Sequence, residues 1–425
     1  MIAWLLISFF VLLFLGVPIA MSLGLSAMGG ILFLGGGSTV TIAQRMFEGM
    51  NSFALLAIPL YTFAGFTMSK GGISKRLMDF CYSIVGHIYG GLAHVNVLSS
   101  MIFAGISGSA VADTAGVSGM FMPEMIRKGY SKNFTVAVTA ISSTIGIIIP
   151  PSIPMVVIAG ICGISTGKLF LGGIIPGILC GLAQMIVSYF LAKKECVPKE
   201  PGHFTIGPVL HGLWESWPAL LMPIIIVGTI TMGIVSPTEA GVIAVVYGLF
   251  AGGIIYRELK WEDIKFAFAE TVRTSGRIFI VIGAAKLYTV MLTTAGFDKW
   301  VAKTMLGFST NPTVILIMIL LIFFIVTMFM ESIATLTLFM PILYPIALGV
   351  GINPIVLSVL ITVVIGIGLV TPPVGMCIYV ACDLMDTTVG EVFPTLVPFI
   401  AATFVCIALM VAFPQLILLP TYLMA

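Results

Sequence analysis

Long stretches of this sequence contain almost no charged side chains, and that feature most limits what the chain can fold into. Of 425 residues, 19 are Lys or Arg and 17 are Asp or Glu, while 59% are hydrophobic. An ordinary soluble domain has about a quarter of its residues charged, so these few charges cannot cover a soluble protein of this size. The sequence therefore predicts an all-α polytopic membrane protein.

Other classes lack support in the composition. The net charge of +2 gives no electrostatic reason to bind nucleic acid. The seven cysteines are scattered and form no CxxC pair, which argues against zinc and against a disulfide framework. The first residues have no basic start and no small-residue cleavage site, so they predict a membrane helix that is retained. No cofactor is indicated.

The apolar segments are separated by short polar breaks, from which a topology can be traced. The breaks cover residues 37–51, 70–79, 127–132, 163–168, 193–217, 257–277, 296–304, 346–354 and 383–391. Basic residues favour the cytoplasmic side, which places the loops 70–76, 127–132, 193–199 and 257–265 inside and the N-terminus outside. Lys299 and Lys303 then fall outside, against the rule. For the first two loops to share a side, residues 93–126 must form a re-entrant hairpin.

Rare residues recur between the two halves of the chain. Pro150-Pro151 recurs as Pro372-Pro373 after 222 residues, Met122-Pro123 as Met340-Pro341 after 218, and Pro18 as Pro237 after 219. We therefore expect a first repeat over 1–199, a connector over 200–217 and a second repeat over 218–425. Each would have about five transmembrane helices and one hairpin (93–126 and 305–346), with a broken helix at 133–162 and 354–382. An odd number of spans makes the second repeat inverted, as in secondary transporters.

Two isolated carboxylates lie within the apolar core. Asp113 is the only acidic or basic residue between Asp79 and Glu124, and Glu331 is the only one between Lys303 and Asp383. They are 218 residues apart, and a carboxylate at membrane depth costs about 3 kcal/mol unless it is paired. They are either functional groups or structural caps of half-helix N-termini.

Four segments combine helix-breaking residues with oxygen-bearing side chains: 105–114, 142–152, 327–335 and 366–373. A tandem proline frees backbone carbonyls, and unwound backbone at membrane depth persists only beside a cavity or an ion. Oxygen ligands suit hard cations, so we expect two Na⁺ sites. The first would use Ser107, Ser109, Gly146 and Ile149, and the second Thr327, Gly368 and Thr371. Any one hydroxyl could instead bond to its own helix.

At this point the chain resembles a known family. The runs IFAGISGSAVADTAGVSGMFMPEM, IGIIIPPSIPM, SPTEAG and GLVTPPVG are similar to the large membrane subunit (DctM-like, or M) of tripartite ATP-independent periplasmic (TRAP) transporters, and most similar to those of sialic-acid systems. The resemblance covers essentially the whole chain. It implies a scaffold, a mobile elevator-type transport domain with two re-entrant hairpins, and a location in the bacterial inner membrane.

The resemblance also implies function and partners. It implies Na⁺-coupled uptake of a carboxylate, with sialic acid (N-acetylneuraminate) favoured over a C4-dicarboxylate or another organic acid. The implied partners are a small membrane subunit (Q), a periplasmic binding protein (P) and membrane lipid. A chain that starts at Met1 with an M-type helix suggests a separate Q. The resemblance places Na⁺ and substrate around Ser107, Ser109, the break at Pro150, Pro151 and Ser152, Glu331, and the break at Pro372 and Pro373. With these break residues and Glu331, we predict as further substrate residues Asp113, Ser143, Ser332 and Thr335.

Two rival functions remain to be weighed. Residues 105–108 match the GxSG pattern of an intramembrane serine protease, but no apolar segment after the motif holds the histidine base that this chemistry needs. A channel would use symmetric pore rings rather than broken repeats. Lys286, a lone cation in the run 278–295, could meet a carboxylate or extend to the membrane interface.

Overall fold

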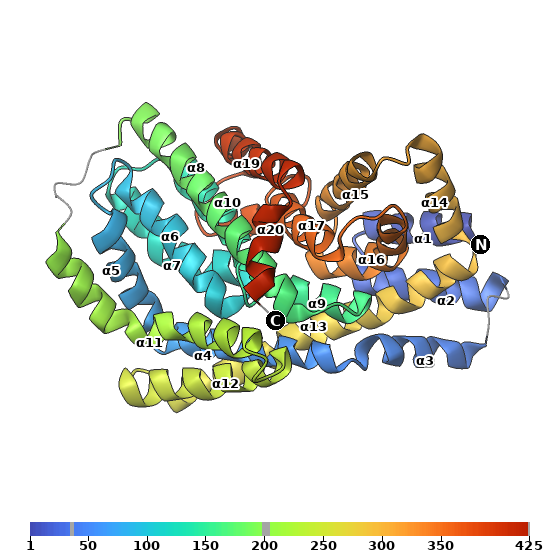
Figure 1. Cartoon of the computed structure of the whole chain (residues 1–425), viewed down its shortest axis with the longest axis horizontal. Coiled ribbons are helices and arrows are strands. Elements are labelled where there is room, and N and C mark those ends of the chain that lie inside the picture. The colour runs from blue at the N-terminus through green and yellow to red at the C-terminus, as the bar shows by residue number, and fades with distance from the viewer. Residues whose placement is uncertain (35–37, 198–204, 424–425) are drawn as a thin grey trace.

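The computed structural model describes residues 1–34, 38–197 and 205–423, which form helices and no strand (Figure 1), so the all-α prediction is confirmed. The helices of the first half are α1 (Ile2–Phe14), α2 (Ile19–Leu34), α3 (Thr39–Met50), η1 (Phe53–Leu56), α4 (Ala57–Lys70), α5 (Ile73–Val85), α6 (Gly91–Ser107), α7 (Ala110–Arg127), α8 (Lys132–Ser143), η2 (Thr144–Ile147), α9 (Ile153–Cys162) and α10 (Thr166–Lys194). Those of the second half are α11 (Ile206–Thr231), α12 (Pro237–Phe250), η3 (Ala251–Ile255), α13 (Trp261–Thr294), α14 (Phe297–Phe308), α15 (Pro312–Thr327), α16 (Ser332–Gly349), α17 (Pro354–Gly368), α18 (Met376–Asp383), α19 (Val389–Ala412), α20 (Gln415–Leu418) and η4 (Leu419–Leu423).

Seven helices in the described ranges are long and apolar enough to cross a membrane. They are 53–70, α10, α11, α12 with η3, α13, α16 and α19. The helices α6, α9, α15 and α17 are apolar but shorter, because each ends at a hairpin tip or at a break. A helix rises 1.5 Å per residue, so none of these four crosses the bilayer alone.

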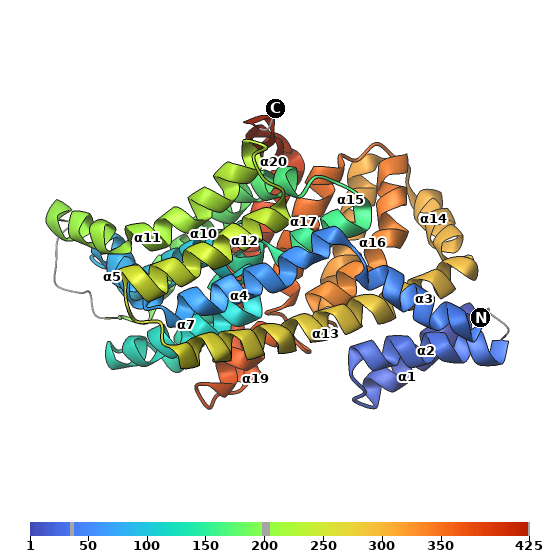
Figure 2. The ribbon, with the colours of Figure 1, turned by 90° about the horizontal axis from the view of Figure 1, so that it is seen from below.

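The helices pack in two groups. In one, α13 contacts α2, α3 and α4, and α4 contacts α12. In the other, α6 and α7 pack on α8, α15 packs on α17, and α10 packs on α19. Figure 1 shows α3, α4 and α12 along one edge of the molecule and α15 and α19 along the opposite edge. Figure 2 shows α13 running lengthwise across the molecule, and it contacts α16 of the second group.

Three segments that the sequence suggested were polar breaks form amphipathic helices instead. They are α3, which lies within 37–51, and α5 and α14, which begin in 70–79 and in 296–304 and extend beyond them. The break expected at 257–277 is also wrong for most of its length, since α13 begins at Trp261. Of the connector 200–217, residues 200–204 lie outside the described residues, and the rest from Ile206 onward forms the start of α11.

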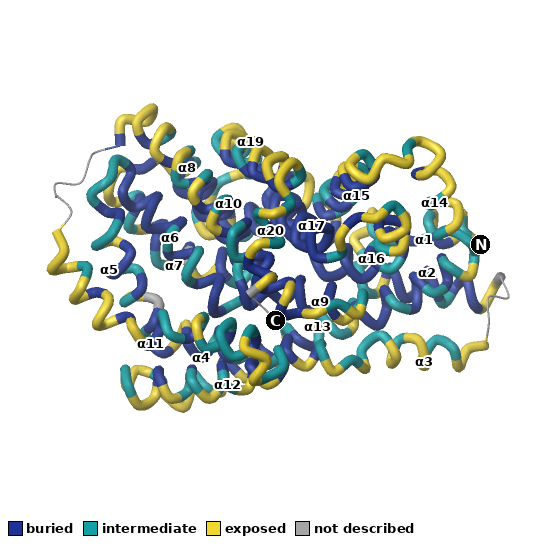
Figure 3. Tube along the Cα trace, in the orientation of Figure 1, coloured by how far each residue is buried: buried dark blue, intermediate teal, exposed yellow. Residues whose placement is uncertain are grey.

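Two helical hairpins lie at the predicted positions. The first, α6 and α7, turns at Gly108 and Ser109. The second consists of α15 and α16, so it begins at Pro312 rather than at residue 305, because residues 305–308 end α14. The inverted relation of the two halves stays a prediction. The most deeply buried helices, α8 and α17, lie in the interior (Figure 3), and each leads directly into a break.

Candidate functional site

The tip of the first hairpin is joined directly to the first break. The Ile153 amide donates a hydrogen bond to the Gly108 carbonyl at 3.2 Å. Gly108 has φ +64°, and a methyl group there would lie 2.6 Å from the Pro151 carbonyl oxygen. Glycine is therefore required both by the left-handed backbone and by the close approach.

Asp113 brings a carboxylate to this junction. It is 3% exposed, and the Ser107 hydroxyl donates to its Oδ1 at 2.5 Å. Its Oδ2 is buried and accepts no hydrogen bond within the described residues. A methyl group on Gly146 would lie 2.0 Å from Asp113 Oδ2 and 3.6 Å from the Ser109 carbonyl oxygen. Oxygens of the tip therefore converge on Gly146.

The break also frees carbonyls on its own side. Gly146 lies four residues before Pro150, which has no amide hydrogen to donate. Ile149 loses its usual helical donor because the Ile153 amide bonds to Gly108 instead. Carboxylate, carbonyl and hydroxyl oxygens are the ligands of hard cations, so the predicted first set gains Asp113 as a neighbour.

The second tip meets the second break in a similar way. The Val374 amide donates to the Met328 carbonyl at 2.9 Å, and a methyl group on Gly368 would lie 2.6 Å from Thr327 Cβ. The hydroxyls of Thr327 and Thr371 donate to their own helices, at 2.6 and 2.7 Å. A hydroxyl that donates its hydrogen keeps lone pairs for another partner.

Glu331 is a helix cap, one of the two alternatives left open by the sequence. Its side chain accepts from the amides of Ile333 (2.9 Å) and Ala334 (3.2 Å) and from the Ser332 hydroxyl (2.7 Å). Asp113 lies inside α7 instead, where Ser109 is the N-cap. The two carboxylates therefore have different structural roles.

Helix boundaries show that pairing the two carboxylates at an interval of 218 was wrong. The helix α7 begins at Ala110 and α16 at Ser332, 222 residues later, and α8 and α17 begin the same distance apart. Glu331 therefore corresponds to Ser109, the other N-cap. Asp113 corresponds to Thr335 rather than to Glu331.

The remaining predicted residues divide by accessibility. Ser143, Pro150, Pro151, Ser152 and Thr335 are buried. The three hydroxyls bond to backbone carbonyls of Thr139 (2.7 Å), Ile147 (2.5 Å) and Glu331 (3.0 Å). By contrast, Pro372 is half-buried and Pro373 is exposed. The second break is thus the accessible one.

The two broken helices meet at residues that lie in the predicted segments but were not assigned to a site. A methyl group on Gly366 would lie 3.3 Å from Thr144 Cβ. Beyond the breaks the halves exchange partners, since α9 packs on α16 and α18 packs on α7. Gly366 begins a Gly-Ile-Gly run before the tandem proline, and this close-packing signal could have indicated the crossing.

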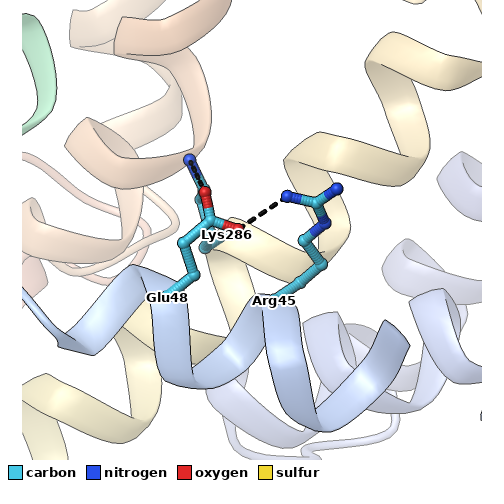
Figure 4. A network of polar contacts seen from close by, with 3 residues as sticks. All are labelled: Arg45, Glu48 and Lys286. Atoms are coloured by element: carbon cyan, nitrogen blue, oxygen red, sulfur yellow. Dashed lines mark hydrogen bonds and ion pairs between the residues drawn. The ribbon is translucent and has the colours of Figure 1, made fainter. Parts of the chain in front are cut away.

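Lys286 points toward Glu48, a residue of α3 that also contacts Arg45 (Figure 4). Its Nζ is 3.9 Å from Glu48 Oε1, and Glu48 Oε2 accepts from Arg45 at 2.6 Å. The Arg45 hydrogen bond, with a smaller contribution from the charge of Lys286, lowers the pKa of Glu48, which lies on α3 outside the candidate spans. Lys286 therefore has a carboxylate partner, and the partner belongs to α3.

Comparison with known proteins decides the family. The family model of the tripartite ATP-independent periplasmic transporter, DctM component, matches residues 6–416. The chain belongs to the DctM family. It is 35% identical to the sialic acid TRAP transporter large permease SiaM of Vibrio cholerae, over 96% of this chain and 95% of that one. It is also 35% identical to the C4-dicarboxylate large permease DctM of Pseudomonas aeruginosa, over 95% and 94%.

Other relatives are longer or more distant. The isethionate permease DctMQ of Oleidesulfovibrio alaskensis is 37% identical over 92% of this chain, which spans 62% of that protein's length. The fold is similar to that of the Alcanivorax borkumensis YdaH transporter, with a TM-score of 0.59 at 13% identity, covering 87% of this chain and 86% of that one. This DctM-family chain is thus a multi-pass inner-membrane large permease and not an enzyme, so the protease alternative falls.

Proposed function

We propose that this DctM-family chain is the large subunit of a Na⁺-coupled importer of an organic acid. Sialic acid is the first candidate, delivered by a periplasmic binding protein to a complex with a small membrane subunit. Relatives are named for sialic acid, C4-dicarboxylates and isethionate. These compounds share an acidic group that is ionised at neutral pH.

The observation that carries Na⁺ coupling is the buried Asp113 oxygen that faces Gly146 without a donor. An unpaired carboxylate at membrane depth is strongly unfavourable, and a cation would compensate it. We assign Asp113, together with Ser107, the Ser109 carbonyl and the freed Gly146 carbonyl, to the first Na⁺ site. Asp113 thereby moves from the substrate set to the cation set. Thr327, Gly368 and Thr371 form the second site.

We propose that the substrate binds at the second break. Helix N-termini attract anions, but Glu331 already supplies a negative charge at the start of α16. The helix α18 starts at Met376, directly after the exposed Pro373 and the 42%-exposed Val374. Its N-terminus is therefore the accessible one for a carboxylate. Movement of the helices α6–α10 and α15–α19 past the group formed by α2, α3, α4, α12 and α13 would carry the bound Na⁺ and acid across the membrane.

Uptake by proteoliposomes tests the proposal. The chain would be reconstituted with its small subunit and with candidate binding proteins, then offered labelled N-acetylneuraminate, succinate and isethionate with a Na⁺ or a K⁺ gradient. We expect uptake of one acid that saturates and requires both Na⁺ and a binding protein. Equal uptake with K⁺ would contradict the coupling, and uptake of succinate or isethionate alone would replace sialic acid as the substrate.

A further inference from the structure

A cavity of about 350 Å³ lies outside the site described above, between the end of α13, the helix α14 and the hairpin helix α16. In Figure 1, α14 lies beside α16, and the two helices are in contact. A water molecule takes about 30 Å³ of the liquid, so the space greatly exceeds that of one bare ion. It is large enough for a small polar group with several atoms.

The cavity wall carries one acidic and one basic side chain, adjacent in the first turn of α14. Asp298 Oδ1 is buried and accepts no hydrogen bond within the described part of the chain. Lys299 is exposed and also lines the cavity. No ion pair joins the two among the described residues. The other carboxylate oxygen of Asp298 is not enclosed, so the side chain can pair with a cation in the cavity.

The opposite wall adds acceptors. Pro341 and Pro345 of α16 both line the cavity. Because Pro345 has no amide hydrogen, the Pro341 carbonyl four residues earlier lacks its helical donor. The same wall ends at Gly349, the C-terminal and therefore negative end of α16. Acceptors gathered on two walls favour an ammonium group, while Lys299 at the exposed side favours an anion.

The surroundings are those of a membrane interface. The helix α14 is amphipathic, and its exposed side chains include Trp300 (60%) and Phe308 (75%). Tryptophan is enriched at the headgroup layer of bilayers. Apolar side chains of Leu306, Ile342 and Ile346 complete the lining. They suit contact with the acyl chains of a lipid whose headgroup occupies the polar part of the cavity.

We propose that this cavity binds the zwitterionic headgroup of an ethanolamine phospholipid. The ammonium group pairs with the Asp298 carboxylate through its other oxygen and with the Pro341 carbonyl, and the phosphate lies against Lys299. Because the cavity is shared by α14 and α16, the lipid bridges the second hairpin to the helix that precedes it. The inference does not depend on the identity of the transported acid.

Native mass spectrometry of the purified, delipidated chain with added lipid tests the proposal. Phosphatidylethanolamine should be retained more than phosphatidylcholine, whose amine has no hydrogen, and more than phosphatidylglycerol, which has no amine. Asp298→Asn and Lys299→Gln should each weaken retention about tenfold, the loss expected for one charge-assisted hydrogen bond. The controls Asp386→Asn and Lys303→Gln, whose residues do not line the cavity, should retain the lipid normally.

A cavity-filling variant keeps the test independent of charge. Ala302→Leu places a larger apolar side chain in the cavity and leaves Asp298 and Lys299 intact, so it too should abolish selective retention. Equal retention of the three lipids, or normal retention in Ala302→Leu, would overturn the proposal. Soluble glycerophosphoethanolamine binding as tightly as the intact lipid would overturn the lipid assignment in favour of a free zwitterion.

Discussion

Asp113 and Glu331 show how two carboxylates in similar sequence settings acquire different chemistry. Glu331 accepts two backbone amides and a hydroxyl at the start of α16, so the helix itself supplies its partners. Asp113 receives one hydroxyl, and its second oxygen remains buried without a donor. A capping carboxylate stabilises the helix that it caps, whereas a carboxylate with an unpaired oxygen can bind a cation or a hydrogen-bond donor.

Replacing Asp113 by Asn should therefore weaken Na⁺ coupling. Loss of the negative charge removes one charged ligand, so we expect the Na⁺ concentration for half-maximal uptake to rise about tenfold or more. Uptake measured at graded Na⁺ concentrations gives this half-maximal concentration. The matched control is Asp386→Asn, at an exposed position. An unchanged Na⁺ dependence would remove Asp113 from the cation site.

Glu331→Gln should act differently, because an amide oxygen still accepts from Ile333 and Ala334. We expect thermal stability to fall by no more than about 1 kcal/mol, the usual worth of a cap, with the Na⁺ dependence close to that of wild type. A melting curve together with uptake at limiting Na⁺ distinguishes the cases. A Na⁺ dependence as impaired as that of Asp113→Asn would make Glu331 a cation ligand too.

The Glu48 carboxylate should make stability depend on acid pH. Its pKa is lowered in the folded chain, first by the Arg45 hydrogen bond and then by the charge of Lys286. The stabilisation is fully present above the unfolded pKa, about 4.3, and is lost as the pH falls below it through the lowered value. Melting temperatures between neutral and acid pH should thus drop less in Glu48→Gln than in wild type; identical drops would contradict the assignment.

At the scale of elements, glycines fix where helices can meet. Gly146 faces Asp113, Gly368 faces Thr327 and Gly366 faces Thr144, each too closely for an ordinary side-chain contact. On α7, by contrast, Gly116 and Gly119 face open space. The same residue type therefore marks close contacts in the breaks but not on α7.

Gly146→Ala should abolish Na⁺-dependent uptake, because its methyl group would lie 2.0 Å from Asp113 Oδ2 and must displace the carboxylate. The matched control is Gly116→Ala, which meets no atom and should stabilise α7 by up to about 1 kcal/mol. Uptake and melting temperature are measured on both variants. Normal transport by Gly146→Ala would show that the carboxylate position does not matter.

The sequence located the elements that contain strong breakers and missed those defined by a polar face. The shared side of two basic loops predicted the first hairpin, the repeat predicted the second, and the tandem prolines predicted both broken helices. The helices α3, α5 and α14 were missed because their mixed composition resembles that of loops. The helix α13 was cut short because its first turns are polar. At 34 residues it spans about 51 Å at 1.5 Å per residue, so one end extends beyond the hydrocarbon core.

Tertiary exposure could not be read from the sequence. The two tandem prolines have nearly the same local sequence, yet the first is buried and Pro373 is exposed. Local pattern cannot reveal this difference, because it depends on which helices cover each break in the folded chain. The pairing of Asp113 with Glu331 failed for a different reason: α16 contains two prolines, and at the interval of 222 residues between α7 and α16 Pro123 matches Pro345 rather than Pro341.

At the scale of the whole molecule, this difference predicts that the second break is accessible and the first is not. In a variant with the exposed Cys196 replaced by Ser, Val374→Cys should react with a membrane-impermeant thiol reagent, whereas Ser152→Cys, at a fully buried position, should not. Bound substrate should slow the first reaction if the acid binds at α18. Equal labelling of both positions would mean that the two breaks are equally accessible.

The exchange of partners beyond the breaks has a consequence for biogenesis. When α9 leaves the ribosome, the helix on which it will pack, α16, is still about 170 residues from being made. At translation rates of 5–20 residues per second, that delay is on the order of 10 to 30 seconds. During that time α9 can pack only on elements of the first half, such as η1, α4 and α10, and the surface that α16 will cover stays open. Assembly quality control should therefore act on the nascent first half.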